Sequence, residues 1–143
     1  MDSVPLRRLA GRRVFLFLLI AIPACAQSMP NEQVIPFMDG LDKHILLTMT
    51  VEGKPLDMLL DTGSQRTIFR RHIGSEGDFV ALRWATGVLT ARECEVVLEK
   101  IRIVALCGVD FPTGDDGLLG EDFLRRFSAF TVDYKNHVLR LVP

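Results

Sequence analysis

The strongest structural signal in this sequence is the segment Leu59-Leu60-Asp61-Thr62-Gly63-Ser64. An aspartate at the end of an apolar strand is costly to bury unless its carboxylate is hydrogen-bonded, because desolvation disfavours the charged form. Gly63 allows a sharp turn that can bring amide N–H groups towards the carboxylate, and the neighbouring hydroxyls can orient it. A plain surface turn is the alternative interpretation, since Asp, Gly and Ser are common turn residues.

The residues around this stretch have the pattern of short strands. His44–Val51 alternates between apolar and polar residues, as a half-buried strand does, and a turn at Glu52–Pro55 leads into the strand Leu56–Leu60. Only one helix is expected, Glu121–Phe127, with apolar residues on one side. The other expected strands are Thr67–Phe69, Phe79–Trp84, Val88–Arg92, Glu95–Leu98, Ile101–Leu106, Ala129–Asp133 and Val138–Val142. Such an all-β chain predicts a barrel or a sandwich.

A second segment, Leu118-Leu119-Gly120, precedes the expected helix. With it the sequence resembles the retropepsin-like aspartic proteases, the single-lobe relatives of pepsin, and especially bacterial members with a signal peptide. In that family a strand ending in Asp-Thr-Gly supplies the catalytic aspartate, and a later apolar-apolar-Gly element passes behind it. The resemblance covers roughly residues 43–142. It implies a small closed β-barrel of the acid-protease type with one short C-terminal helix.

The resemblance also implies roles for the four residues of the loop. Asp61 would be the catalytic carboxylate, and Thr62 would hydrogen-bond across a dimer interface. The amide of Gly63 would help to fix the carboxylate, and the hydroxyl of Ser64 would bond its outer oxygen. Structural support behind the loop would come from Leu118, Leu119 and Gly120.

Between the two segments the family places a flexible hairpin, the flap, which closes over substrate. Phe79–Arg92 stands in that position, and the residues expected to contact substrate are Trp84, Ala85, Thr86 and Gly87. Trp84 departs from the glycine-rich flaps of viral members. It either lines a substrate subsite or packs as an ordinary strand residue.

Hydrolysis by this route needs two carboxylates that share a proton, one acting on the water and one on the carbonyl oxygen. The sequence contains one Asp-Thr-Gly, and no second copy surrounds Asp115, Asp116 or Asp133. We therefore expect a homodimer with one Asp61 from each subunit. It would be an exported aspartic endopeptidase that cleaves peptide or protein substrates without a cofactor. The alternatives are a non-catalytic peptide-binding module and a structural envelope lipoprotein on the same scaffold.

Residues 1–26 have the layout of a secretory signal peptide. Four arginines precede the apolar run Val14–Ile22, and small residues follow it. That run is shorter than the roughly 20 residues that span a bilayer. We expect an exported protein, periplasmic or secreted.

Processing of this segment leaves alternatives open. Ala24-Cys25-Ala26 fits the Ala-x-Ala rule, with cleavage before Gln27. Ile22-Pro23-Ala24-Cys25 also resembles a lipobox, which would make Cys25 a lipid anchor and the one point of membrane contact. Arg12-Arg13 resembles a twin-arginine address.

Composition fits a globular domain. Of the 143 residues, 48% are hydrophobic and 24% are charged, and the formal net charge is −1. Disorder is therefore excluded, and the absence of a basic excess argues against nucleic-acid binding. Loss of residues 1–26 removes four arginines and one aspartate, which changes the charge to −4. We expect a lead-in segment over 27–42, with at most a short strand at Val34–Phe37, and the protease domain over 43–143.

Two cysteines follow the signal segment, Cys94 and Cys107. In an oxidising compartment such a pair is expected to form a disulfide, with two buried free thiols as the alternative. Their spacing does not match a zinc site. His44, His72 and His137 are scattered along the chain, so the sequence predicts neither a metal site nor a Cys–His nucleophile.

Overall fold

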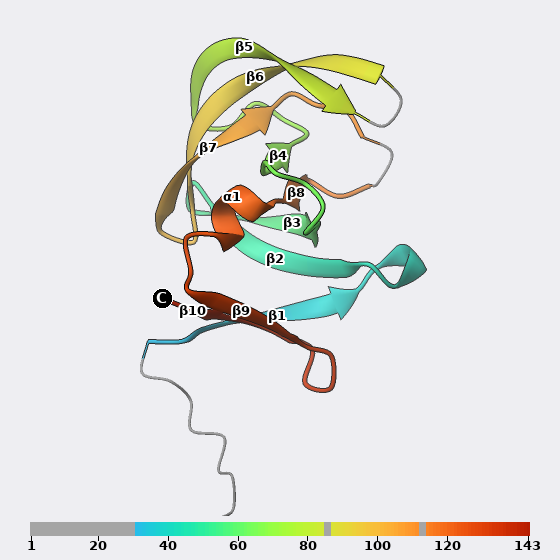
Figure 1. The fold of residues 1–143 in the computed structure, drawn as a ribbon, viewed down its shortest axis with the longest axis vertical. Coiled ribbons are helices and arrows are strands. Elements are labelled where there is room, and N and C mark those ends of the chain that lie inside the picture. The colour runs from blue at the N-terminus through green and yellow to red at the C-terminus, as the bar shows by residue number, and fades with distance from the viewer. Residues whose placement is uncertain (1–30, 85–86, 112–113) are drawn as a thin grey trace, which may run out of the picture.

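The computed structural model describes residues 31–84, 87–111 and 114–143, which form ten strands, one α-helix and one 3₁₀ turn (Figure 1). The expectation of an all-β chain is confirmed. The elements in chain order are β1 (Gln33–Asp39), η1 (Leu41–Lys43), β2 (Ile45–Val51), β3 (Lys54–Leu60), β4 (Ile68–Phe69), β5 (Ser75–Trp84), β6 (Gly87–Leu98), β7 (Ile101–Cys107), β8 (Gly117–Leu119), α1 (Glu121–Leu124), β9 (Ala129–Asp133) and β10 (Val138–Val142).

All the described strands belong to one sheet, in the order β5-β6-β7-β4-β8-β3-β2-β1-β10-β9. Strand β2 also meets β6 through one residue pair, Val51 opposite Leu98, so the sheet curls back on itself. A single pair is not a continuous ladder around the sheet. The closed barrel expected from the sequence therefore stays a prediction.

The central feature is the place of β8, which runs between β3 and β4 although those two strands are close neighbours in the chain. β8 is parallel to β3, with Leu60 opposite Leu119, and antiparallel to β4, with Ile68 opposite Leu118. The chain must leave β3, turn, and return on the far side of β8. That turn is the segment around Asp61.

The core lies inside the curled sheet and contains two groups of buried apolar side chains. The larger group joins β1, β2, β3, β4, β6, β7, β8 and β10 to α1, and its largest fully buried members include Phe69, Phe123 and Leu47. The smaller group lies under the β5–β6 hairpin and includes Ile68, with Leu82 packed against it. Each such side chain stabilises the fold by roughly 1.5–3 kcal/mol.

Two strands are longer than the sequence pattern indicates. β6 is one continuous strand, whereas the sequence pattern predicts two, Val88–Arg92 and Glu95–Leu98, because charged residues lie near its centre. Arg92 pairs with Glu76 of β5, and Glu93 pairs with Arg66, so these charges have partners and do not interrupt the strand. β5 begins at Ser75, four residues before the expected start at Phe79, and a register shift between Glu76 and Phe79 obscures its alternation.

The lengths of β1 and α1 also differ from the sequence prediction. β1 is a seven-residue strand between β2 and β10, longer than the expected Val34–Phe37. The helix is shorter than Glu121–Phe127 and ends at Leu124. Its last turn tightens, because the amides of Arg126 and Phe127 donate to carbonyls three residues earlier.

A disulfide joins Cys94 of β6 to Cys107 of β7. Cys94 lies opposite Ala105 and Cys107 lies opposite Arg92, so the two half-cystines are diagonal neighbours on one face of the pair. Their Cα atoms are 6.0 Å apart, within the usual range, and both side chains are buried.

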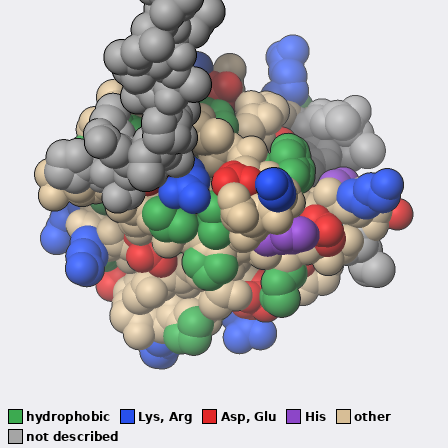
Figure 2. Space-filling model, turned by 90° about the horizontal axis from the view of Figure 1, so that it is seen from below, with side chains coloured by type: hydrophobic (Ala, Val, Ile, Leu, Met, Phe, Trp, Pro, Cys, Tyr) green, Lys and Arg blue, Asp and Glu red, His purple; other side chains and the backbone are tan. Residues whose placement is uncertain are grey.

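The outer strands leave apolar side chains exposed. Figure 2 views the molecule from below, the side on which β1, β9 and β10 lie in Figure 1, and shows apolar side chains among charged ones. Met38, Phe130 and Tyr134 are among the exposed large hydrophobic residues. In the part of the chain that the structure describes, no helix is long and apolar enough to cross a membrane.

The crossing of β8 generates a stability prediction at Gly120. A Cβ atom there would lie 2.5 Å from the carbonyl oxygen of Arg66 and 2.8 Å from the amide nitrogen of Thr67. Since backbone atoms cannot rotate away, Gly120→Ala should lower the free energy of unfolding by about 2 kcal/mol or more. Denaturation in guanidinium chloride measures this loss.

Gly114→Ala is the matched control, because a Cβ atom at Gly114 meets nothing within 4 Å. It should change the free energy of unfolding by less than about 0.5 kcal/mol. Equal stability of the two variants would contradict the proposed close approach of the two backbones.

Candidate functional site

Asp61 follows β3 directly, at the point where the chain turns away from the sheet. Its amide donates to the carbonyl of Leu119 at 3.1 Å, which continues the pairing of β3 with β8 by one more bond. The residue is half-buried. Strand β3 therefore places this carboxylate at the end of the strand, beside β8.

A tight turn holds the carboxylate of Asp61 in place. The amide of Gly63 donates to Asp61 Oδ1 at 3.0 Å, and the amide of Ser64 donates to the Asp61 carbonyl at 3.1 Å. A hydrogen bond to the charged form of a carboxylate stabilises that form. Thr62, at the tip of the turn, is exposed.

Ser64 differs from what the resemblance implies. Its hydroxyl donates to the carbonyl of Arg66 at 2.7 Å, and a hydroxyl has only one proton to donate. In this structure Ser64 therefore braces the loop itself and does not donate to Asp61. Its carbonyl accepts from the amide of Glu121 at 2.8 Å, which ties the loop to the start of α1.

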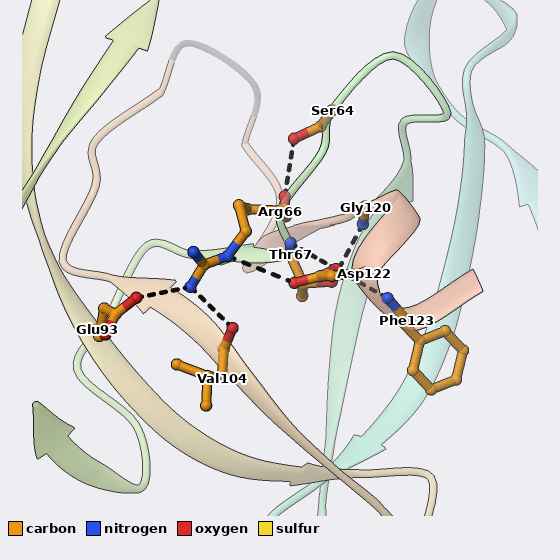
Figure 3. A network of polar contacts seen from close by, with 8 residues as sticks. All are labelled: Ser64, Arg66, Thr67, Glu93, Val104, Gly120, Asp122 and Phe123. Carbon is orange, nitrogen blue, oxygen red and sulfur yellow. Dashed lines mark hydrogen bonds and ion pairs between the residues drawn. The ribbon is translucent and has the colours of Figure 1, made fainter. Parts of the chain in front are cut away.

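Behind the loop lies a buried polar cluster around Thr67, whose exposed fraction is 0%. Both its amide and its hydroxyl donate to Asp122 Oδ1, at 2.8 and 2.6 Å, and its hydroxyl accepts from the amide of Gly120 at 3.2 Å. Figure 3 shows these contacts beneath the chain that leaves Ser64. They join the residue before β4 to the start of α1 and to Gly120, which follows β8.

Arg66 extends this cluster towards the hairpin. Its Nη2 donates to Glu93 Oε1 of β6 at 3.1 Å and to the carbonyl of Val104 of β7 at 3.0 Å. Its Nε lies 3.8 Å from Asp122 Oδ2, a buried oxygen without a hydrogen-bond partner among the described residues. The guanidinium of Arg66 thus offsets the charge of two carboxylates (Figure 3).

A hollow of about 540 Å³ opens beside Asp61. It lies between the loop and the β5–β6 hairpin, and its lining residues are Asp61, Gly63, Ser64, Gln65, Arg66, Ile68, Leu82 and Arg83. Asp61 supplies the only carboxylate among these described lining residues.

The remaining expected site residues lie around this centre. Leu118 and Leu119 are buried in β8, and Gly120 follows them against the backbone of Arg66. Trp84 ends β5 opposite Gly87, which begins β6. The predictions for Ala85 and Thr86 fall outside the described residues. Within the described ranges, no group of three or more His, Cys, Asp or Glu residues could hold a metal ion.

Resolved pKa shifts occur outside the hollow. Hydrogen bonds from the side chain and amide of Asn136 lower the pKa of Asp133. A hydrogen bond to Glu95 raises the pKa of Arg102. Neither group lines the hollow.

Sequence reasoning missed the three residues behind the loop, Arg66, Thr67 and Asp122. Thr67 stands next to apolar Ile68 and Phe69, which marked a strand but gave no sign of its partner. Asp122 is 55 residues away in sequence. Only the strand crossing brings the two together.

Comparison with solved structures gives an independent view of the fold. The chain is similar to the crystal structure of a retropepsin-like aspartic protease from Rickettsia conorii, with 19% sequence identity, a TM-score of 0.50, and coverage of 77% of this chain and 87% of that one. The chain has a retropepsin-like fold.

EIAV protease in complex with the inhibitor HBY-793 is also similar, with 18% identity, a TM-score of 0.47, and coverage of 62% of this chain and 92% of that one. No protein-family model matches the sequence, and no curated protein matches it either.

The buried cluster generates a prediction at Thr67. Thr67→Val keeps the shape of the side chain but removes the hydroxyl between Asp122 and Gly120, which leaves a buried amide and a carboxylate oxygen short of a partner. The free energy of unfolding should fall by about 1–3 kcal/mol. Differential scanning calorimetry would record this as a lower Tm.

Thr90→Val provides the comparison, since Thr90 is exposed on β6. Its Tm should stay within about 2–4 °C of the wild type. If Thr67→Val were as stable as Thr90→Val, the buried cluster would not be what anchors the loop.

Proposed function

We propose that this protein is an aspartic endopeptidase in which two copies of Asp61, one from each of two chains, activate a water molecule. The observation that carries the proposal is the position of Asp61. Its carboxylate stands at the end of β3, is held by the amide of Gly63, and borders an open hollow. The retropepsin-like fold supports the same chemistry.

The reaction needs a carboxylate pair that carries one shared proton, because two like charges a few Å apart do not both ionise. The ionised Asp61 takes a proton from water, and the water oxygen attacks the peptide carbonyl carbon. The protonated Asp61 gives its proton to the carbonyl oxygen. Collapse of the tetrahedral species breaks the C–N bond: the amine leaves with a proton from the pair, and one hydroxyl of the tetrahedral species returns its proton to the pair as the carboxylic acid forms.

A homodimer is part of the proposal. Asp61 is the only carboxylate among the described residues that line the hollow, so a second chain has to supply the other one. Thr62 is exposed beside Asp61, where it can meet its counterpart. Two-fold symmetry would bring both residues to the axis together.

The outer strand β9 supports an interface on the same side of the molecule. Ala129, Phe130 and Thr131 are all exposed, so both faces of this strand are open to solvent. A groove of about 320 Å³ joins Thr62 to the end of α1 and the start of β9. An exposed edge strand with apolar residues is a common site of pairing with a further chain.

The dyad generates the first test. Asp61→Asn should lower kcat/KM for peptide cleavage by about 10³-fold or more, because it removes the general base and the general acid. Profiling a mixed peptide library by mass spectrometry measures this, with circular dichroism to check the fold. Asp42→Asn, an exposed aspartate of η1, should keep full activity.

Mixing the two proteins tests whether the subunits share the site. When half of the subunits carry Asp61→Asn and the chains exchange freely, activity should fall to about a quarter of the wild type, because only dimers with two intact subunits cleave. A fall to one half would contradict a shared dyad. Full activity of purified Asp61→Asn would contradict the proposed dyad. Peptide binding without turnover in the wild type would favour the peptide-binding module.

Export to the periplasm or the outside of the cell completes the proposal. The signal segment 1–26 lies outside the described residues, and the sequence pattern alone supports it. The disulfide between Cys94 and Cys107 fits an oxidising compartment. Mass spectrometry of the protein purified from its native host should find Gln27 as the first residue. A lipid-modified Cys25 at the N-terminus would instead establish the envelope lipoprotein.

A further inference from the structure

The hollow beside Asp61 is lined by two arginines as well as by the aspartate. Arg66 contributes from the chain after the loop, and Arg83 contributes from β5. Arg66 has carboxylate partners within the protein and Arg83 does not, and this difference affects which substrate side chains the hollow can bind.

The charge of Arg66 is already balanced. Glu93 lies 3.1 Å from its Nη2, and Asp122 Oδ2 lies 3.8 Å from its Nε. A further donor bond goes to the carbonyl of Val104. The guanidinium of Arg66 therefore binds groups of the protein itself, and the two neighbouring carboxylates reduce the positive electrostatic potential that it produces in the hollow.

The charge of Arg83 is not balanced in this way. Arg83 is exposed and lies opposite Val88 in the hairpin, and its side chain has no hydrogen bond or ion pair with any of the described residues. From Phe79 to Ala91 the sequence contains no aspartate or glutamate. Within this stretch no side chain of β5 or of the paired part of β6 can neutralise it, and the acids of β5, Glu76 and Asp78, lie at its other end.

The rest of the lining is polar or apolar without charge. Ile68 and Leu82 supply apolar surface, and Gln65 supplies an amide. Asp61 is the one anion among the described lining residues, and an acidic peptide side chain beside Arg83 would meet a cation whose side chain has no partner among the described residues. A lysine or arginine in the same place would meet like charge.

Resting on the proposed function, we propose that this hollow selects peptides with a glutamate or aspartate side chain beside Arg83. The carboxylate would form a charge-assisted pair with the guanidinium, which is suited to bind both carboxylate oxygens. Because the pair would be partly exposed, the preference for an acidic residue should be about three- to fivefold. Salt should weaken it, since exposed pairs are screened.

The experiment uses matched octapeptides that carry Glu or Gln at one position and are otherwise identical. Two readouts are taken with the full mature protein: kcat/KM for cleavage by the wild type, and Kd for binding to the uncleaving Asp61→Asn protein. At one peptide position the Glu form should be preferred about three- to fivefold in both. Raising the salt to 1 M should reduce that preference.

Arg83→Gln should abolish the preference, and Arg83→Glu should reverse it in favour of a Lys peptide. The matched control is Arg71→Gln, because Arg71 is exposed and lines a different hollow, together with Lys54 and His72. This control should keep the preference of the wild type.

The outcomes separate the two proposals. A Glu preference in binding that Arg83→Gln removes upholds the inference, even if no peptide is cleaved, in which case the endopeptidase proposal fails alone. Cleavage or binding with no Glu preference at any position overturns the inference and leaves the endopeptidase standing. Absence of any peptide binding overturns the inference too.

Discussion

Gly120 passes against the backbone of Arg66 with no room for a side chain, because β8 has to run between two strands that the chain visits in quick succession. This close crossing organises the whole site. It places Leu119 where its carbonyl accepts from the amide of Asp61, and it brings the start of α1 under the loop. A side chain at Gly120 would push its backbone away from the backbone of Arg66 and Thr67.

The crossing also explains why a polar residue, Thr67, is fully buried behind the loop. Three backbone segments meet behind the loop, and their amides need acceptors once water is excluded. Asp122 accepts from Thr67 and from the amide of Phe123, and Thr67 accepts from Gly120. The loop is therefore braced from behind. The carboxylate of Asp61 can therefore face the hollow while the contacts behind the loop hold the turn in place.

The relation between the site and the hairpin follows from the same contacts. Arg66 joins the segment after the loop to β6 and β7, and the disulfide joins those two strands close by. The base of the hairpin is thus tied to the loop, whereas Arg83, farther along β5, has no such tie to the described residues. The anchored end supports the chemistry that we propose, and the free charge faces the space for a ligand.

Local patterns in the sequence were sufficient for the elements with strong signals. The sequence pattern predicts the apolar run into Asp61 and the apolar-apolar-Gly segment. It also predicts the strands Ala129–Asp133 and Val138–Val142 with the bounds that the structure has. The length of β6 is not predicted, since paired charges at its centre look like a break when their partners are distant in sequence. The short helix was overestimated, because its apolar residues continue beyond the point where its hydrogen bonds tighten.

The sequence alone predicts that an aspartate ends an apolar strand in a glycine turn, because strand periodicity and turn chemistry are local properties. The tertiary structure decided what surrounds that aspartate. Thr67 and Asp122, 55 residues apart, meet only because β8 crosses between β3 and β4. Ser64 turns its proton to Arg66, and Arg66 and Arg83 differ in charge balance only through neighbours from other strands. Such contacts depend on which strands lie side by side, and no local pattern encodes that arrangement.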